Sequence, residues 1–470
     1  MQGENQSIGR VKKGARAAAV IAALFAGHAA SADNLFDFTH DPIDPARNSP
    51  PLVAGFTPAP FLRNDNAAVV GPYLSTQTVK AVKIELVPVT GPSLALYGPA
   101  GTRPKYTFMD FEGPTAPAVA GTQRNAINTT SGGQVASNQI YVGNFNIYPV
   151  PNDPTRPATG TPGQPAGSSF ETLYSAADYF TAGLNMANEA LYPGSPDLRN
   201  PAAGNSTAPN IRSALLTLPI TRLSLTTANL PAGHKHIPYV NRFNNFGNLN
   251  LDTNNNAADG YQFVTGQPLA GRPTLNTTDQ LLSRGDFKAM IAHYRARGAD
   301  GVHLLDGGVV GYTRPQFEQD AKEGWEFAPF ASIFAGGGAA LATLDTMVRT
   351  DTGGLRSLED AGMVYSGVYS LAQNKMALLV SNLSETPQNL VIQNKIGGKS
   401  VALGTVNVLG GQHKLLEFTG VGTQWQLTTP GGTAVFIDSD RSGTGVPEPA
   451  VMGTLALAGL MGLSRRRRRA

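Results

Sequence analysis

The chain has 470 residues, enough for roughly two or three domains, and a hydrophobic content of 41% that can build a sizeable core. It contains no cysteine, which excludes disulfides, thiol catalysis and cysteine-bound metal centres. Residues 1–32 contribute +3 and residues 446–470 contribute +4 to the net charge of +3, which leaves −4 for residues 33–445. A mildly acidic body is not expected to bind nucleic acid.

The first 32 residues have the layout of a secretory signal peptide. A basic segment at 10–16 precedes an apolar run at 17–26, and Ala30, Ser31 and Ala32 then form an A-x-A cleavage site. The apolar run is too short to span a bilayer, and a buried N-terminal helix is the alternative interpretation. We predict that signal peptidase removes residues 1–32.

The middle of the chain alternates strand-like and helix-like patterns. Residues 33–80 predict an extended lead-in with one or two strands. Within 81–350, strands are predicted at 82–96 (as strand, turn and strand), 106–112, 139–150, 216–225, 236–243 and 301–306. Helices are predicted at 170–191, at 283–296, from Thr313 onwards and at 339–347. This alternation favours a parallel sheet, and we expect an α/β fold with a (β/α) TIM-barrel-like domain.

The pattern changes after residue 350. Short strands with Gly, Asn and Pro turns are predicted at 363–371, 376–382, 389–393, 401–408, 414–418, 424–428 and 433–437. Their even spacing indicates a small antiparallel β-sandwich at 358–440. A barrel followed by a β-sandwich loosely resembles the layout of many secreted glycoside hydrolases.

The C-terminal segment 446–470 has three parts in a fixed order. Pro447, Glu448 and Pro449 come first, an apolar stretch at 450–463 follows, and an arginine cluster ends it (Arg465, Arg466, Arg467, Arg468 and Arg469). This order resembles the PEP-CTERM sorting signal of Gram-negative-type bacteria. The resemblance implies an envelope or extracellular protein, held transiently in the inner membrane by a C-terminal helix and processed by an exosortase-type peptidase. A polybasic patch for anionic lipid or nucleic acid is the alternative.

Three carboxylates are the candidate catalytic groups. Asp110 and Glu112 stand two residues apart on a predicted strand and therefore point to one face. Asp306 ends another predicted strand and could supply the distant partner. A carboxylate pair at the carboxyl ends of barrel strands suits glycoside chemistry, where one group is the acid and the other the nucleophile or base. A solvated or salt-bridged strand end is the alternative.

Polar and aromatic residues near these strands are candidates for substrate binding. They are Tyr239, Asn241, Arg242, His303, Tyr312 and Trp325. Aromatic side chains can stack on sugar rings, although Trp325 suits a core position equally well, and His303, inside an apolar strand, suits a core position better. His293, on its helix, is predicted to be exposed.

Metal and cofactor motifs are weak. His234 and His236 form an H-x-H pair, but a clear third ligand is missing, so no metal site is assigned. The segment 396–400 (IGGKS) lacks the first glycine of a phosphate loop, and neither G-x-S-x-G nor H-E-x-x-H occurs. We expect no cofactor.

Two functional hypotheses follow. The first is an exported, envelope-sorted, glycoside hydrolase-like enzyme that acts on extracellular polysaccharide. The alternative is a non-catalytic surface or extracellular-matrix protein that binds polysaccharide or a protein partner on a barrel scaffold.

Overall fold

A computed structural model describes residues 35–37, 53–85, 87–111, 116–133, 140–145, 176–189, 220, 223–224, 227, 230–240, 284–304, 314–341, 348–349, 355–356, 363–383, 387–402 and 405–437. Its contacts group residues 1–437 into one compact unit and 438–470 into a second. The fold described below belongs to the first unit.

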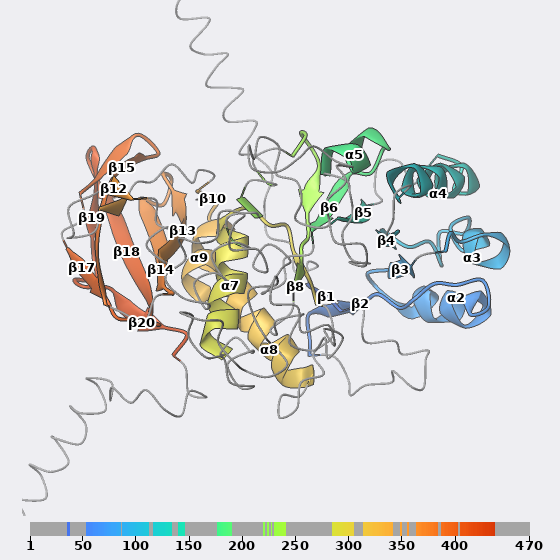
Figure 1. Ribbon diagram of the computed structural model, residues 1–470, viewed down its shortest axis with the longest axis horizontal. Coiled ribbons are helices and arrows are strands. Elements are labelled where there is room, and N and C mark those ends of the chain that lie inside the picture. The colour runs from blue at the N-terminus through green and yellow to red at the C-terminus, as the bar shows by residue number, and fades with distance from the viewer. Residues whose placement is uncertain are drawn as a thin grey trace, which may run out of the picture. The chain divides into compact units, whose positions relative to one another are not determined.

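The first half of this unit is a mixed α/β region built on a curled parallel sheet (Figure 1). Its strands are β1 (Leu35–Asp37), β2 (Phe56–Pro58), β3 (Ala81–Glu85), β4 (Tyr106–Asp110), β5 (Ile140–Phe145), β6 (Met186–Glu189), β7 (Lys235–His236), β8 (Tyr239–Val240) and β9 (Val302–Leu304). Strands β3 to β7 pair in sequence order, and the order β2-β1-β9-β8 forms the remainder. Every pairing between these strands is parallel.

Two short segments join these pieces into a closed ring of pairings. After β2, Phe61 bridges to Lys83, and Lys83 N–H donates to the carbonyl of Pro60 at 3.0 Å. Strands β7 and β8 follow each other along the chain and are separated by two residues. Pro238, one of these two, also lies beside β9, because its carbonyl accepts from His303 N–H at 2.9 Å. Closure gives each strand an inner and an outer face.

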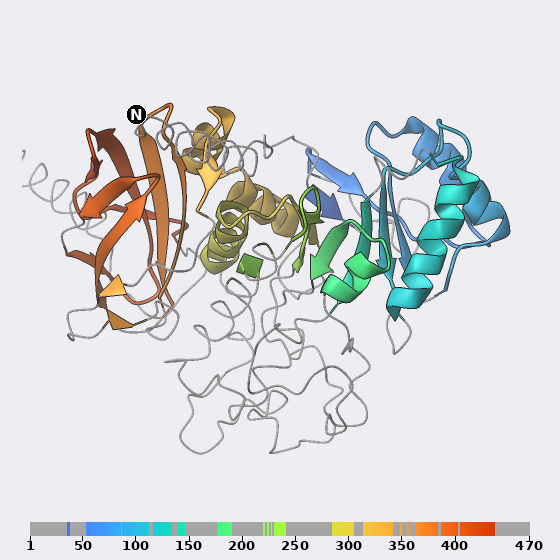
Figure 2. The same cartoon turned by 90° about the horizontal axis from the view of Figure 1, so that it is seen from above.

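Helices cover the outer face of the sheet. They are α2 (Ala67–Thr76), α3 (Gly91–Ala95), α4 (Ala116–Thr130) and α5 (Ala176–Thr181), and Figure 2 shows α4 and α5 beside the strands. Outward side chains of β3 and β4, such as Val82, Ile84 and Met109, pack with Val70, Leu74 and Ile127 of these helices. The strand alternation therefore sends aliphatic side chains outward and leaves the inner face to other residues.

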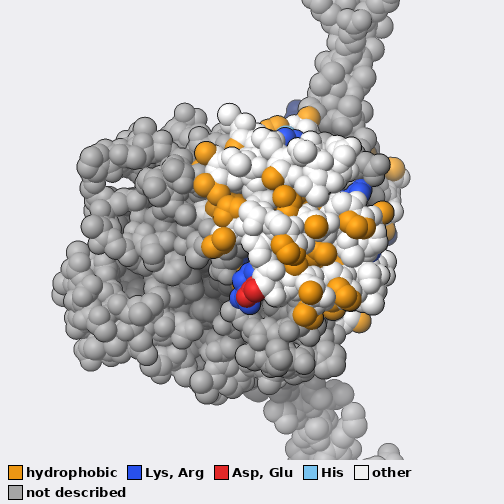
Figure 3. All heavy atoms as spheres, turned by 90° about the vertical axis from the view of Figure 1, so that its right-hand side faces the viewer, with side chains coloured by type: hydrophobic (Ala, Val, Ile, Leu, Met, Phe, Trp, Pro, Cys, Tyr) orange, Lys and Arg blue, Asp and Glu red, His pale blue; other side chains and the backbone are white. Residues whose placement is uncertain are grey.

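The helical face over α2, α3 and α4 carries few charges. Helices α2 and α3 contain no charged residue, and α4 contains only Arg124. Figure 3 shows this face as mostly uncharged side chains with scattered hydrophobic ones. This face therefore reflects the low charged fraction of the whole chain, which is 15%.

The second half of the unit is a β-rich region with mainly antiparallel strands. The strands are β10 (Ala339–Ala340), β11 (Val348–Arg349), β12 (Leu355–Arg356), β13 (Met363–Ser370), β14 (Lys375–Asn382), β15 (Gln388–Ile396), β16 (Lys399–Ala402), β17 (Val406–Val408), β18 (His413–Val421), β19 (Gln424–Leu427) and β20 (Thr433–Val435). The β16–β19 pair is parallel and the others are antiparallel. The predicted strands at 363–371, 376–382, 389–393, 414–418, 424–428 and 433–437 are confirmed within a few residues, whereas 401–408 divides into β16 and β17.

Helix α7 (Arg284–Ala296) contacts both halves. Its Phe287 and Met290 share a core with Val302 and Leu304 of the curled sheet. Its Ala289, Ala292 and Ala296 share another core with β13, β14, β18 and helix α9 (Ala328–Ala335). As predicted, Gly298 caps the C-terminal end of this helix, and its φ of 94° is a conformation that favours glycine.

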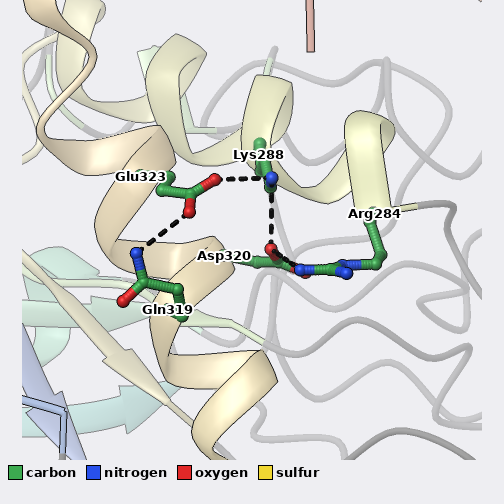
Figure 4. Close-up of polar contacts among 5 residues, drawn as sticks. All are labelled: Arg284, Lys288, Gln319, Asp320 and Glu323. Carbon is green, nitrogen blue, oxygen red and sulfur yellow. Dashed lines mark hydrogen bonds and ion pairs between the residues drawn. The ribbon is translucent and has the colours of Figure 1, made fainter. Parts of the chain in front are cut away.

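An ion-pair network joins α7 to helix α8 (Arg314–Trp325), as Figure 4 shows. The buried Asp320 accepts from Arg284 at 2.8 Å and lies 3.3 Å from Lys288. Lys288 also reaches the half-exposed Glu323 at 2.5 Å, which in turn accepts from Gln319 at 2.9 Å. The two helices are therefore held by polar contacts as well as by apolar ones.

Several predicted elements were wrong. The second half of 82–96 is helix α3, with Pro92 in its first turn. Among the described residues of the predicted helix at 170–191, Ala176–Thr181 form α5, whereas Met186–Glu189 pairs with β5 and β7 as strand β6. The described positions Ile220, Leu223 and Ser224 of the predicted strand 216–225 are helical. The segment 339–347 begins with strand β10, not a helix.

Candidate functional site

The inner face of the curled sheet carries large aromatic and charged side chains. On β4, Tyr106, Phe108 and Asp110 share this face, since alternate residues of a strand point the same way. On β3 the same face receives Ala81 and Lys83. In register, Lys83 lies opposite Phe108. The two strands therefore bring a lysine and an aspartate together at the carboxyl end of the sheet.

Lys83 and Asp110 form a buried ion pair. Lys83 Nζ lies 3.0 Å from Asp110 Oδ2, and the two side chains are 3% and 8% exposed. The ammonium also lies 5.3 Å from the ring centres of Phe61 and Tyr239, within the range of a cation–π contact. Residues from β3, β4, β8 and the segment after β2 thus converge on one cation.

His303 completes this inner layer. Its ring stacks on Tyr239 with centroids 4.5 Å apart at 21° and lies 4.1 Å from the ring of Phe108. Burial lowers the pKa of His303 well below its ordinary value, and the positive charge of Lys83 lowers that pKa further. The imidazole is therefore neutral at neutral pH and behaves as one more flat ring.

Three of the predicted site residues meet here. Asp110, Tyr239 and His303 all point to the inner face. Trp325 does not, because it lies in the core between α7 and α8, where Arg295 covers its ring at 5.3 Å. Glu112, Asp306, Asn241, Arg242 and Tyr312 lie outside the described residues.

Lys83 was missed by the sequence analysis, although a signal exists. It is the one charged residue in the strand core AVKI at 81–84, where Val82 and Ile84 occupy the opposite face. A lysine at such a position either points to solvent or finds a buried partner. Here it finds Asp110.

The H-x-H pair lies away from this layer. His236 is buried and its Nδ1 lies 3.2 Å from the hydroxyl of Thr227, while His234 is half-buried against the ring of Phe180 at 4.7 Å. Among the described residues, no group of three His, Cys, Asp or Glu side chains is arranged to hold a metal ion.

The predicted targeting segments lie outside the described residues. These include Ala30 and Ala32 at one end, and Pro447, Glu448, Pro449 and the arginines 465–469 at the other. Within the part of the chain that the structure describes, no helix is both long and apolar enough to cross a bilayer.

Comparisons with known proteins give structural neighbours only. No family model and no curated protein matches the chain. Apo pullulanase from Klebsiella pneumoniae matches with a TM-score of 0.35 and 11% identity, over 71% of this chain and 45% of that chain. The maltogenic α-amylase AmyB from Thermotoga neapolitana matches with a TM-score of 0.33 and 9% identity, over 79% of this chain and 77% of that chain.

These neighbours are glycoside hydrolases at low identity. The chain spans less than half the length of the pullulanase chain that it matches. TM-scores of this size do not establish a shared fold or activity, so the function has to be argued from the residues of this chain.

Proposed function

We propose that the protein is an exported, glycoside hydrolase-like protein that acts on extracellular polysaccharide. In this proposal the curled sheet is a (β/α) barrel, the β-rich region is its β-sandwich, and the site lies where the strands end. The observation that carries the proposal is the buried Lys83–Asp110 pair on the inner face at the end of β4. Two observations support the proposal: separating two charges from water is costly, and barrel active sites lie at the carboxyl ends of the strands.

The ion pair divides the roles of the candidate carboxylates. Asp110 already binds an ammonium at 3.0 Å, so we assign it to hold negative charge beneath the sugar and not to donate a proton. Glu112, two residues further along the sequence, is assigned as the proton donor, and Asp306 as its partner. The donor protonates the glycosidic oxygen as the C–O bond breaks, and the partner directs water or its own oxygen to the anomeric carbon.

A panel of neutral and acidic polysaccharides tests this proposal with the full chain. We expect hydrolysis of at least one polymer, and losses of about 10²- to 10⁴-fold in Glu112→Gln and Asp306→Asn. Glu323→Gln, at the half-exposed end of α8, is the matched control and is expected to retain full rate. Unchanged rates in both carboxylate variants would remove these residues from the mechanism.

A second candidate function is non-catalytic polysaccharide binding. Two observations favour it: the ammonium of Lys83 neutralises Asp110, and rings from Phe36, Tyr106, Phe108 and Tyr239 fill the inner face. The weakly charged face over α2 to α4 suits a neutral polymer (Figure 3). Affinity electrophoresis on the same polymers separates the two functions, since a binding protein is retarded without shortening the polymer.

Export and sorting form the third part of the proposal. Signal peptidase and an exosortase-type peptidase are the processing partners, and the mature protein resides in the envelope or outside the cell. Replacing Arg465–Arg469 with serine tests this in a host that has an exosortase. We expect the variant to accumulate unprocessed in the inner membrane or to be misrouted, whereas unchanged fractionation would contradict the resemblance to a PEP-CTERM signal.

A further inference from the structure

A continuous chain of buried polar side chains crosses the contact between α7 and the β-rich region. Asp286, His293 and Arg297 lie on one side of α7 and its C-terminal turn, at spacings of seven and four residues. Ser366 of β13, Ser381 of β14 and His413 of β18 face them from the sheet. We call these six residues the interface chain. All of them are at least nine-tenths buried.

At its acidic end, the interface chain runs from a carboxylate through an imidazole to a hydroxyl. His413 Nε2 lies 3.1 Å from Asp286 Oδ1, and His413 Nδ1 lies 2.7 Å from Ser381 Oγ. His293 Nε2 lies 2.8 Å from the same hydroxyl oxygen. Ser381 therefore stands between two imidazoles.

At its basic end, the interface chain runs from His293 to the guanidinium of Arg297. His293 Nδ1 lies 2.7 Å from Ser366 Oγ, and Arg297 Nε donates to that oxygen at 2.7 Å. The guanidinium is fixed by two more bonds, to Ser224 Oγ at 2.8 Å and to the carbonyl of Tyr365 at 2.7 Å.

With one proton on each imidazole, these distances are satisfied by one direction of proton donation, which starts from the carboxylate. Asp286, as a carboxylate, can only accept, so His413 donates to it from Nε2 and accepts at Nδ1 from Ser381. Ser381 Oγ in turn accepts from His293 Nε2. His293 Nδ1 then accepts from Ser366, whose oxygen also accepts from Arg297 Nε. Each imidazole carries its proton on Nε2 in this arrangement.

Part of the interface chain has the connectivity of a catalytic triad, but it does not act as one. Asp286, His413 and Ser381 follow each other as carboxylate, imidazole and hydroxyl. However, Ser381 is 1% exposed and its oxygen already lies between two imidazoles. No substrate carbonyl can reach that oxygen without opening the interface.

We propose that the interface chain is a pH-responsive latch, which holds α7 against the β-rich region while His293 is neutral and loosens when acid protonates it. Protonated His293 would donate from both nitrogens, so Ser366 would receive two donors and lose the acceptor of its own proton. The added charge would also lie beside Arg297.

The charged groups around His293 favour this direction of response. Arg297 faces it from the end of α7, and His413, backed by Asp286, faces it from β18. On α8, Asp320 and Glu323 are engaged by Arg284 and Lys288 and do not compensate. Burial lowers the pKa of His293 well below its ordinary value, and Arg297 and then His413 lower it further.

The sign of the pH effect follows from this pKa. The unfolded chain binds a proton at His293 near pH 6.5, whereas the folded chain does so only at lower pH. The contribution of the neutral imidazole to the free energy of unfolding is therefore fully present above about pH 6.5. It is lost progressively as the pH falls below this value.

Thermal unfolding of the full chain between pH 8 and pH 5 tests the latch. We expect the melting temperature of His293→Gln to fall less than that of the unchanged chain, by roughly 2–4 °C over this range. His234→Gln, at a half-buried histidine outside the interface, is the matched control and should follow the unchanged chain. Equal pH slopes for all three proteins would overturn the proposal.

Imidazole NMR of the unchanged chain, labelled with ¹⁵N-histidine, gives an answer even where a variant fails to fold. We expect both His293 and His413 to carry a proton on Nε2 at pH 7.5, and His293 to be neutral there and to remain neutral well below pH 6.5 while the protein stays folded. A proton on Nδ1 of His293, or titration of His293 at its ordinary value, would overturn the latch.

Discussion

The inner layer of the curled sheet and the interface chain both bury an acid, a base and histidine, but they connect them differently. In the inner layer, Lys83 and Asp110 touch at 3.0 Å, and His303 lies among rings. In the interface chain, Asp286 and Arg297 are linked through two serines and two histidines. A direct pair neutralises charge locally, whereas a relay works only while each member keeps its proton in place. The relay should therefore respond to the protonation of His293, whereas the contact between Lys83 and Asp110 includes no histidine.

The largest effect is expected from separating the direct pair. Asp110→Asn leaves Lys83 buried without its counter-charge, and we expect a loss of about 3–5 kcal/mol in the free energy of unfolding. The double variant Lys83→Met/Asp110→Asn should recover much of that loss, because no unpaired charge remains. Denaturant titration of both variants and of Lys83→Met completes the cycle. Additive losses would show that the pair is not coupled.

The next effect concerns the middle of the relay. Ser381→Ala removes the hydroxyl between His413 and His293 and leaves two imidazole nitrogens without a partner, at an expected cost of about 2–3 kcal/mol. Ser370→Ala on β13 is the matched control, since this buried serine accepts one bond, from Gln373 N–H at 3.2 Å. Denaturant unfolding at pH 7.5 measures the loss of unfolding free energy in both variants. Equal losses would show that the position of Ser381 between two histidines adds nothing to the contribution of a buried serine.

A smaller effect is expected at the histidine of the inner layer. His303→Phe keeps a flat ring against Tyr239 and Phe108 and should change the unfolding free energy at pH 7.5 by about 1 kcal/mol. Because the pKa of His303 is lowered in the fold, this histidine costs stability below pH 6.5, and the variant should lose less stability on acidification. An unchanged pH slope would contradict the neutral state assigned to His303.

The smallest effect is expected where the charges meet water. Glu323→Gln weakens the pair with Lys288 at a half-exposed site, and we expect about 0.5 kcal/mol or less, decreasing with added salt. Asp320→Asn, at the fully buried centre of the same network, should cost more (Figure 4). Equal losses of unfolding free energy in the two variants would show that burial does not determine the strength of ion pairs in this protein.

Local patterns predicted the regular elements best. The strands of the β-rich region are rich in apolar and β-branched residues and end at clear turns, so β13, β14 and β18 could be located from the sequence. Strand β6 could not, because its short Ala-containing segment also suits a helix, and only pairing with β5 and β7 decides the outcome. Strand β1, of three residues, is too short to carry a period, whereas the equally short β9 lies within the strand predicted at 301–306.

The sites depend on contacts that no local pattern contains. Asp110 could be selected because it ends an apolar strand, but its pairing with Lys83 requires the register of β3 and β4. His293 was predicted to be exposed and is 1% exposed in the fold. Its spacing from Asp286 and Arg297 marks a polar stripe on α7, whereas the partners on the sheet lie 73 and 88 residues away in the sequence.

Helix α7 belongs equally to both halves, and this limits how the protein can be divided or recombined. A chain cut near residue 350 would keep the helix but leave Asp286, His293 and Arg297 facing water where the sheet had been. The β-rich half alone would expose Leu379 and Leu415, which now pack against α7 and α9. A new α/β region could therefore be grafted onto this β-rich half only if it included a helix with the same polar stripe.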